Sequence, residues 1–199
     1  MTEHYFSEKP QSALRLYSLT FSFFGHSLEL YTASGLFAVK KVDKGSILLL
    51  SCAKSLLHGK EKVLDLGCGY GVLGLSIQKI FPTIDLTLSD VNERAVEITK
   101  KNLERNHLKA KLVQSFSFEK IPEEFDLVLL NPPQTAGREL CIQLMKDAFE
   151  HLGKKASLLI VARHNKGGRT LSAYLEEIFG NVECLGKQGG YRVYRGIKR

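Results

Sequence analysis

Short apolar segments alternate with longer amphipathic segments along most of this chain. The apolar segments have the length of buried strands and lie at residues 63–66, 86–89, 112–114, 125–130, 157–161 and 182–185. The segments between them have helical periodicity, most clearly at residues 93–105, 139–152 and 170–179. Strands and helices in alternation predict an α/β fold, with a parallel sheet that is covered by helices on both faces.

The two ends of the chain depart from this pattern. Near the C-terminus, Gly189-Gly190 separates the last of these apolar segments from residues 191–194, which predicts an antiparallel hairpin. Near the N-terminus, residues 16–24 and 28–32 flank Gly25-His26 and predict a small β-hairpin. The parallel sheet is therefore expected to end in an antiparallel pair of strands.

A helix is expected after the N-terminal hairpin. Ser46 precedes the apolar run at residues 47–50, so we expect it to cap a helix that continues to about Leu57. The hairpin and this helix would form an N-terminal appendage, residues 1–60, packed on a core of residues 61–199. Because 199 residues are enough for one well-buried domain, one compact domain is expected overall.

Composition narrows the class of protein. Hydrophobic residues make up 44% and charged residues 25% of the chain, which excludes a disordered protein. No apolar run is long enough to span a membrane, and the N-terminus lacks the pattern of a signal peptide, so a cytoplasmic protein is expected. The four cysteines include no CxxC pair and the six histidines lack ligand spacing, so no disulfide and no metal is assigned.

Positive charge gathers in the C-terminal part of the chain. The net charge is +7, and residues 163–199 contain eight Lys or Arg against three acidic residues. This concentration favours a polyanionic partner, of which nucleic acid is the common example in the cytosol. Solubility alone would also account for the charge. The charge therefore favours a nucleic-acid partner only slightly over a role in solubility.

A glycine-rich turn follows the first strand of the core. The sequence Gly67-Cys68-Gly69-Tyr70-Gly71 leads into a helix that is expected to begin near Val72. Glycines let a ligand approach the main chain closely, and a helix N-terminus offers free N–H groups and a positive dipole end. Asp90 ends the second strand about 20 residues further on, the usual position of an acid that binds ribose hydroxyls. These features predict an adenosine-containing ligand.

Asp65 helps to decide which adenosine-containing ligand is meant. Residues 69–74 match the GxGxxG pattern of dinucleotide-binding proteins, which would indicate an NAD-dependent oxidoreductase. A carboxylate at the end of the first strand would repel a pyrophosphate but attracts the ammonium and sulfonium groups of S-adenosylmethionine (AdoMet). AdoMet is therefore the favoured cofactor, with a purely structural glycine turn as the remaining alternative.

The fourth strand of the core runs directly into Asn131-Pro132-Pro133. The prolines lack N–H groups and fix φ, so the sheet ends here in a rigid loop. The Asn131 side-chain oxygen and the Pro132 carbonyl could each accept a hydrogen of an exocyclic amine and turn its lone pair toward a methyl donor. Orientation would then carry most of the rate without a strong general base. An Asn-Pro turn without function is common, but its position behind the glycine loop favours a catalytic role.

The glycine loop, the Asn-Pro-Pro loop and residues 32–37 and 42–50 resemble class I AdoMet-dependent methyltransferases. The similarity is closer to the small-methyltransferase family of the ribosomal RNA guanine-N2 enzyme, and it extends from residues 5–10 to residues 189–193. It implies a Rossmann-like sheet of seven strands with a C-terminal antiparallel hairpin. The cofactor-binding residues that it implies are Asp65, Gly67, Cys68, Gly69, Asp90, Val91, Ser115, Phe116 and Asn131.

Two residues depart from the family pattern. Phe116 stands where many relatives carry an aspartate for the adenine amine, so a backbone group or stacking on Phe116 is expected to replace it. Gln134 stands where an aromatic residue usually stacks on the substrate base. Phe37 or Tyr191 could supply that ring, although both could equally be core residues, and for Tyr191 the core role is favoured.

The resemblance implies an AdoMet-dependent N-methyltransferase that acts on an exocyclic amine of a nucleobase in RNA. Ribosomal RNA with a guanine-N2-like target is the expected substrate. Besides the catalytic Asn131, Pro132 and Pro133, the residues expected to contact substrate are Phe37, Gln134, Arg138 and Arg163, although the arginines could equally be solvated. The alternatives are a protein glutamine-N5 methyltransferase, an NAD-dependent oxidoreductase and a non-catalytic RNA-binding scaffold.

Overall fold

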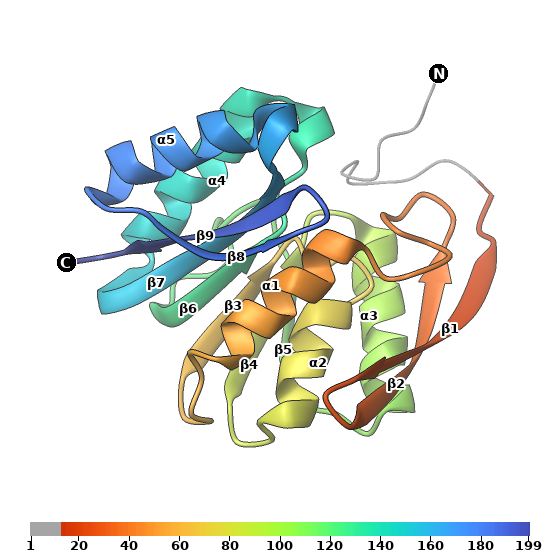
Figure 1. The fold of residues 1–199 in the computed structure, drawn as a ribbon. Coiled ribbons are helices and arrows are strands. Elements are labelled where there is room, and N and C mark those ends of the chain that lie inside the picture. The colour runs from red at the N-terminus through yellow and green to blue at the C-terminus, as the bar shows by residue number, and fades with distance from the viewer. Residues whose placement is uncertain (1–12) are drawn as a thin grey trace.

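A sheet of seven strands forms the centre of the protein (Figure 1). The computed structural model describes residues 13–199, so residues 5–10, to which the family resemblance extended, lie outside the described residues. In chain order the strands of the sheet are β3 (Lys62–Leu66), β4 (Asp85–Asp90), β5 (Lys111–Gln114), β6 (Phe125–Leu130), β7 (Leu152–Arg163), β8 (Glu183–Gln188) and β9 (Tyr191–Ile197).

The order of the strands across the sheet is β5-β4-β3-β6-β7-β9-β8. Strands β3 to β7 are mutually parallel, whereas β9 is antiparallel to both of its neighbours, β7 and β8. Gly189 and Gly190 form the turn of the β8–β9 hairpin with positive φ. The predicted Rossmann-like sheet with a C-terminal antiparallel hairpin is confirmed. The chain order reverses direction between β3 and β6, and such a switch point opens a crevice at the carboxyl ends of the strands.

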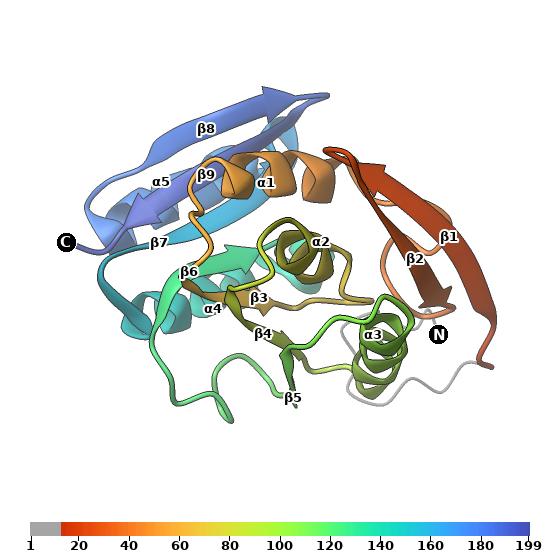
Figure 2. The same ribbon diagram turned by 90° about the horizontal axis from the view of Figure 1, so that it is seen from below.

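Helices cover both faces of the sheet (Figure 2). One face carries α1 (Lys44–Lys54), α2 (Val72–Ile80) and α3 (Glu93–Arg105), and the other carries α4 (Arg138–Glu150) and α5 (Arg169–Phe179). Strand β3 shows the reason, because Val63 packs into one hydrophobic cluster while Leu64 and Leu66 pack into the other. Within residues 13–199, none of the helices is long and apolar enough to cross a bilayer.

Helix α1 begins earlier than the sequence pattern indicated. Asp43, and not Ser46, is its N-cap: the Asp43 Oδ2 atom accepts a hydrogen bond from the Ser46 backbone N–H at 3.1 Å. The helix also ends at Lys54 instead of near Leu57. The prediction was wrong because the helix begins with Lys44 and a glycine, so its apolar periodicity starts only after the first turn. Ser46 lies inside the first turn, where its hydroxyl makes a different contact.

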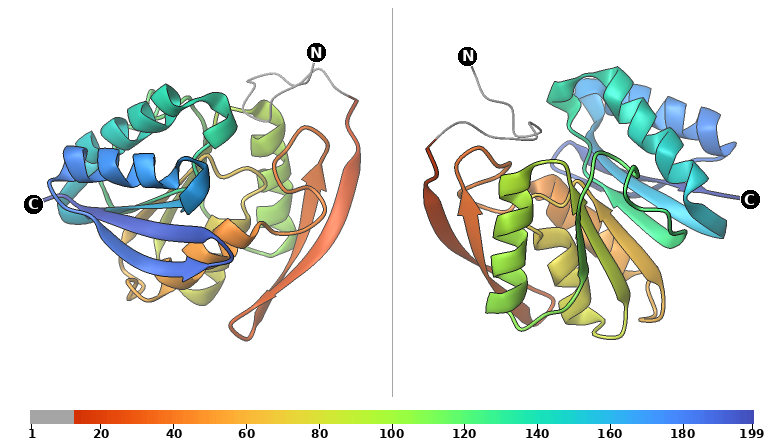
Figure 3. Two further views of the ribbon diagram at one scale, coloured as in Figure 1. Left: turned by 45° about the horizontal axis from the view of Figure 1, so that its top comes forward. Right: turned by 180° about the vertical axis from the view of Figure 1, so that it is seen from behind.

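The N-terminal strands β1 (Leu16–Phe23) and β2 (His26–Ala33) form a separate two-stranded antiparallel sheet (Figure 3). Its turn is Phe24-Gly25, one residue earlier than expected, and both residues have positive φ. Two successive residues with positive φ are what a two-residue turn of type I′ needs, so His26 belongs to the strand and not to the turn.

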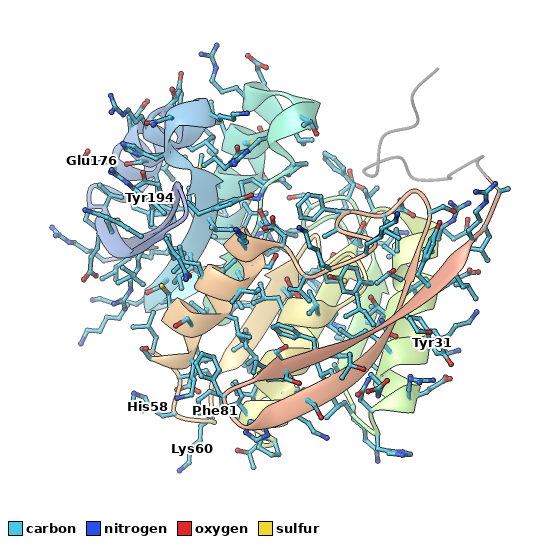
Figure 4. All side chains as sticks on the ribbon, turned by 45° about the vertical axis from the view of Figure 1, so that its right-hand side comes forward. Tyr31, His58, Lys60, Phe81, Glu176 and Tyr194 are labelled. Carbon is cyan, nitrogen blue, oxygen red and sulfur yellow. The ribbon has the colours of Figure 1, made fainter. Side chains whose placement is uncertain are left out.

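Two asparagine side chains, one in α3 and one at its C-cap, hold this hairpin against the core. Asn102 accepts a hydrogen bond from the Tyr31 N–H at 2.7 Å and donates one to the Tyr31 carbonyl at 2.9 Å. Asn106 makes the same pair of bonds with Glu29, at 3.0 and 2.9 Å. The two asparagines, one helical turn apart, thus act as a partner strand for β2, and Tyr31 lies where β2 meets α3 (Figure 4).

Candidate active site

A cavity of about 560 Å³ lies at the carboxyl ends of the central strands, at the switch point of the sheet. The glycine loop, the Asn-Pro-Pro loop, the segment before α1 and the start of β9 all contribute to its wall. Nearly all residues selected from the sequence line this single cavity, namely Phe37, Asp65, Gly67, Cys68, Gly69, Asp90, Val91, Ser115, Phe116, Asn131, Pro132, Pro133, Gln134 and Arg163.

The glycine loop presents main chain to the cavity. Gly67 and Gly69 have φ of +72° and +59°, and a side chain at either position would meet nothing within 4 Å. Backbone conformation, not lack of space, therefore requires glycine here, and the main chain stays open to a ligand. Gly74 has another role, because a Cβ there would collide with Leu88, so glycine lets α2 lie close to β4.

Asp65 is a buried carboxylate, with 3% of its surface exposed. Its Oδ2 atom accepts a hydrogen bond from the Gly74 N–H at 2.8 Å. Burial raises the pKa of Asp65 to about 7, against the lowering effect of that hydrogen bond, and the nearby Asp90 raises it further. Near neutral pH the free protein therefore holds this carboxyl partly protonated, and a cation would favour its ionised form.

Asp90 lies beside it at the end of β4. Burial also raises the pKa of this carboxyl, to about 6, although its two oxygens accept hydrogen bonds from the Gly69 and Asn92 N–H groups at 2.8 and 2.9 Å. The pKa of the buried Cys68 thiol is raised well above its ordinary value, first by burial and then by the two carboxylates. Cys68 therefore stays protonated and acts as a small apolar wall residue instead of a nucleophile.

Asn131 is oriented by a contact that the sequence did not indicate. Its Nδ2 atom donates a hydrogen bond to the Ser46 hydroxyl at 3.0 Å, which leaves the side-chain oxygen as the group available for a ligand. The Pro132 carbonyl accepts a hydrogen bond from the Gln134 N–H at 2.8 Å. One of its two lone pairs is thus used within the loop, and the second remains for a ligand.

A polar cluster connects α1 with the C-terminal hairpin on the cavity wall. The Tyr191 hydroxyl donates a hydrogen bond to Asp43 Oδ1 at 3.2 Å, and a Cβ on Gly45 would lie 2.9 Å from the Tyr191 ring. The Tyr70 hydroxyl also lines this wall; it is buried and has no hydrogen-bond partner within the described residues. Burial, together with the charge of Asp43, raises the pKa of Tyr70, so this hydroxyl remains a donor.

The residues expected to contact substrate are not all at the cavity. Phe37 lines it with 43% of its surface exposed. Arg163 lines it with its guanidinium 5.4 Å from the centre of the Tyr191 ring, so Tyr191 both packs on the core and faces the cavity. Arg138, in contrast, is exposed at the start of α4, forms an ion pair with Glu139 at 3.7 Å and does not line the cavity.

Several further residues line the cavity without having been predicted as site residues, among them Asp43, Ser46, Tyr70 and Lys166. Asp43 and Ser46 have the spacing of an N-cap and its first turn, so the helix start was detectable, but no local pattern shows that Ser46 meets Asn131. Among residues 13–199, no group of three or more His, Cys, Asp or Glu side chains could hold a metal ion.

The family model described as the methyltransferase small domain matches residues 27–195. The chain is 35% identical over 202 aligned residues to the uncharacterized protein YbxB of Bacillus subtilis, and the alignment covers all of both chains. It is 38% identical over 172 residues to the ribosomal RNA small subunit methyltransferase C of Hamiltonella defensa, with 84% of this chain and 50% of that relative covered. The chain thus spans about half the length of that ribosomal RNA methyltransferase.

Two solved structures are similar to this chain in their fold. The 16S rRNA N2 methyltransferase RsmC of T. thermophilus, in complex with AdoMet and guanosine, has a TM-score of 0.82 and 26% identity, with 96% of this chain and 52% of that chain covered. A methyltransferase from Pyrococcus furiosus has a TM-score of 0.68 and 24% identity, with 77% and 82% covered. The second comparison concerns the fold alone.

Proposed function

This chain belongs to the methyltransferase small domain family, and on that premise we propose that it methylates an exocyclic amine of a base in ribosomal RNA, with AdoMet as the methyl donor. The observation that carries the proposal is that Asp65, Asp90 and Asn131 line one cavity. Membership of the family also sets aside the alternative of NAD-dependent hydride transfer. The activity for which these relatives are named, methylation of ribosomal RNA, supports the choice of substrate.

The residues present fit AdoMet in charge and in shape. The buried carboxylates Asp65 and Asp90 suit a ligand with cationic groups and ribose hydroxyls, and the open main chain at Gly67 and Gly69 allows close approach. The Tyr70 hydroxyl is an unsatisfied buried donor, which a ligand carboxylate or hydroxyl would satisfy. When bound, AdoMet supplies the methyl group on its sulfonium.

Asn131 would position the amine that accepts the methyl group. Because Ser46 holds the Nδ2 atom, the Asn131 oxygen faces a substrate as a hydrogen-bond acceptor for one amine hydrogen. The free lone pair of the Pro132 carbonyl would accept the other hydrogen. Two acceptors on a rigid loop fix the direction of the nitrogen lone pair and stabilise the positive charge that develops on nitrogen, so no strong base is needed.

Aromatic faces on the cavity wall would hold the target base. Gln134 offers no ring, but Phe37 and Tyr191 both line the cavity from other segments. Stacking on such rings contributes about 1–3 kcal/mol per base. A guanine with its exocyclic N2 amine toward Asn131 agrees with the guanosine bound to the T. thermophilus enzyme.

Replacement of Asn131 tests this mechanism. We expect Asn131→Ala to lower methyl transfer at least about 100-fold, because the acceptor that orients the amine is lost. Affinity for AdoMet should stay nearly unchanged, since Asp65 and Asp90 remain. The measurement is transfer of label from AdoMet to unmodified ribosomal subunits, free ribosomal RNA and ribosomal protein, together with AdoMet binding by calorimetry.

Gln143→Ala provides a matched control, because Gln143 is an exposed amide on α4 away from the cavity. This variant should retain full activity. Full transfer by Asn131→Ala would overturn the proposed mechanism. Label that appears only in a protein glutamine would overturn the proposed substrate class and favour the glutamine-N5 alternative.

A further inference from the structure

A second, open depression of about 290 Å³ lies next to the active-site cavity. The turn after β7, His164–Gly168, forms one side of it, and the tip of the β8–β9 hairpin forms the other. Tyr191 lines both hollows, so they lie on either side of this residue. The side chains around it are polar or basic and include His164, Asn165, Lys187, Gln188 and Arg192. We call this depression the basic groove.

Positive charges face one another in the basic groove. Lys187 and Arg192 are direct cross-strand partners in β8 and β9, an arrangement of like charges that destabilises a sheet. Arg169 donates a hydrogen bond to His164 Nε2 at 2.9 Å, which fixes the ring as the neutral tautomer. The pKa of His164 is lowered by desolvation and by three nearby cations, Arg192, Arg169 and Lys187.

Carboxylates do not compensate this charge. In the part of the chain that the structure describes, none of Lys166, Arg169, Lys187 and Arg192 forms an ion pair with an acidic residue. Further along the same strand, Arg195 pairs with Glu183 at 3.8 Å. The hairpin therefore has a neutralised half and an uncompensated tip, and the uncompensated tip is the part beside the active site.

Cations line both the cavity and the groove. Arg163 and Lys166 line the cavity, and Arg163 is the register partner of Tyr191 between β7 and β9. The tip of the β8–β9 hairpin lies beside the beginning of α1, the helix that contributes Ser46 to the cavity (Figure 3). A nucleotide chain attached to a base inside the cavity could leave it across this rim.

We propose that the basic groove binds the phosphodiester backbone next to the target nucleotide of a substrate RNA. This inference rests on the proposed function for the identity of the polyanion. Guanidinium and ammonium groups, with the neutral amides of Asn165 and Gln188 beside them, match phosphate oxygens as charged and neutral donors. Such contacts position an RNA without reading its sequence.

The double variant Lys187→Gln/Arg192→Gln tests the groove directly. Binding of a short fluorescent RNA hairpin is measured by anisotropy over a series of KCl concentrations. The loss of two phosphate contacts should reduce the slope of log K against log salt by about 1.4 for single-stranded RNA and about 1.8 for a duplex. AdoMet binding should not change. Should the double variant fail to fold, Lys187→Gln alone should reduce the slope by about half as much.

Lys154→Gln/Lys155→Gln provides a control with the same change in net charge. Both lysines are exposed at the start of β7, at the end of the sheet away from the cavity. This control should keep the slope of the unaltered protein. An unchanged slope in the groove variant, or an equal reduction in the control, would overturn the assignment. A further outcome is that polyglutamate displaces the fluorescent RNA from the unaltered protein as well as unlabelled RNA does, with no such competition in the groove variant. That result would also overturn the assignment, in favour of an acidic protein as the ligand.

The outcome for the groove is separable from the outcome for the proposed function, because RNA binding is measured without turnover. In one outcome the groove variant loses salt-dependent RNA binding while the unaltered protein transfers no methyl group to RNA. In that case the groove proposal is supported and the proposed methylation of RNA is wrong. If methyl transfer to RNA is found but the slope is unchanged, the proposed function holds and the groove proposal is wrong.

Discussion

At the scale of single residues, Asp65 shows how binding chemistry is built into the core. It lies in β3 between two leucines, where a continuous apolar strand would be more stable. Its one hydrogen bond, from Gly74, does not offset the loss of hydration, and its pKa is raised to about 7 as a result. A cationic ligand would offset that loss, so the residue is unfavourable in the free protein and favourable in the complex.

The raised pKa predicts how AdoMet binding depends on pH. A cation binds the ionised carboxylate, so below the pKa of Asp65 binding must first release a proton. Affinity should therefore fall as pH falls, by about tenfold between about pH 7.5 and about pH 6. Calorimetry in buffers of different ionisation enthalpy would detect the released proton.

Asp65→Asn should bind AdoMet weakly at every pH and should lose this dependence over the upper half of the range, where Asp90 is still ionised. Asp85→Asn, at the exposed start of β4, is the matched control and should retain the pH profile of the unaltered protein. A flat profile in the unaltered protein would contradict the role assigned to Asp65.

At the scale of elements, α3 connects the N-terminal hairpin with the glycine loop. Asn102 bonds both the N–H and the carbonyl of Tyr31 in β2, and its Nδ2 atom also donates to the Tyr70 carbonyl at 2.8 Å. Thr99 on the same helix donates to the Gly69 carbonyl at 2.8 Å. One helix thus provides hydrogen-bond partners both for backbone groups of β2 and for the glycine loop.

Asn102→Ala should therefore affect both stability and binding. It leaves one buried and two partly buried backbone groups without this partner, which should reduce the free energy of unfolding by about 3 kcal/mol in urea denaturation. AdoMet affinity should fall as well, because the glycine loop loses a support. The exposed neighbour Lys101→Ala should stay within about 0.5 kcal/mol of the unaltered protein. A loss below about 1 kcal/mol for Asn102→Ala would show that the hairpin does not depend on this anchor.

At the scale of the whole molecule, the N-terminal hairpin and the sheet share one hydrophobic cluster. Phe23 and Leu30 of the hairpin pack in the same cluster as Leu49 of α1, Ile98 of α3 and Leu129 of β6. The segments that line the active-site cavity come from both the N-terminal region and the core. We therefore infer that residues 13–199 unfold as one unit.

Thermal unfolding tests this inference. A single transition is expected by circular dichroism and by dye fluorescence, and AdoMet at about 100 times its Kd should add about 2.7 kcal/mol of stability. For a protein of this size that corresponds to an increase in Tm of about 5–10 °C. Two transitions, of which only one responds to AdoMet, would show instead that the hairpin unfolds separately from the core.

Much of the fold followed from local pattern. The strands of the sheet were found because buried strands are short apolar runs, and the C-terminal hairpin was found because Gly189-Gly190 is a two-residue turn. The errors occurred at ends of elements: the N-cap of α1 is Asp43 instead of Ser46, and the first hairpin turns at Phe24-Gly25. Apolar periodicity is weak at such ends, because capping and turn residues are polar or small.

The sequence by itself determined the α/β class, the glycine loop and the two acids at the ends of β3 and β4, because each depends on residues that are close in the chain. Only the tertiary structure decided that the Ser46 hydroxyl, 85 positions earlier in the chain, accepts a hydrogen bond from the Asn131 amide. The same is true of the hydrogen bond from Tyr191 to Asp43 on the cavity wall. The tertiary structure also placed Arg138 outside the cavity and the uncompensated cations of the hairpin beside it. Contacts between distant segments result from the packing of all elements together, and no local pattern contains them.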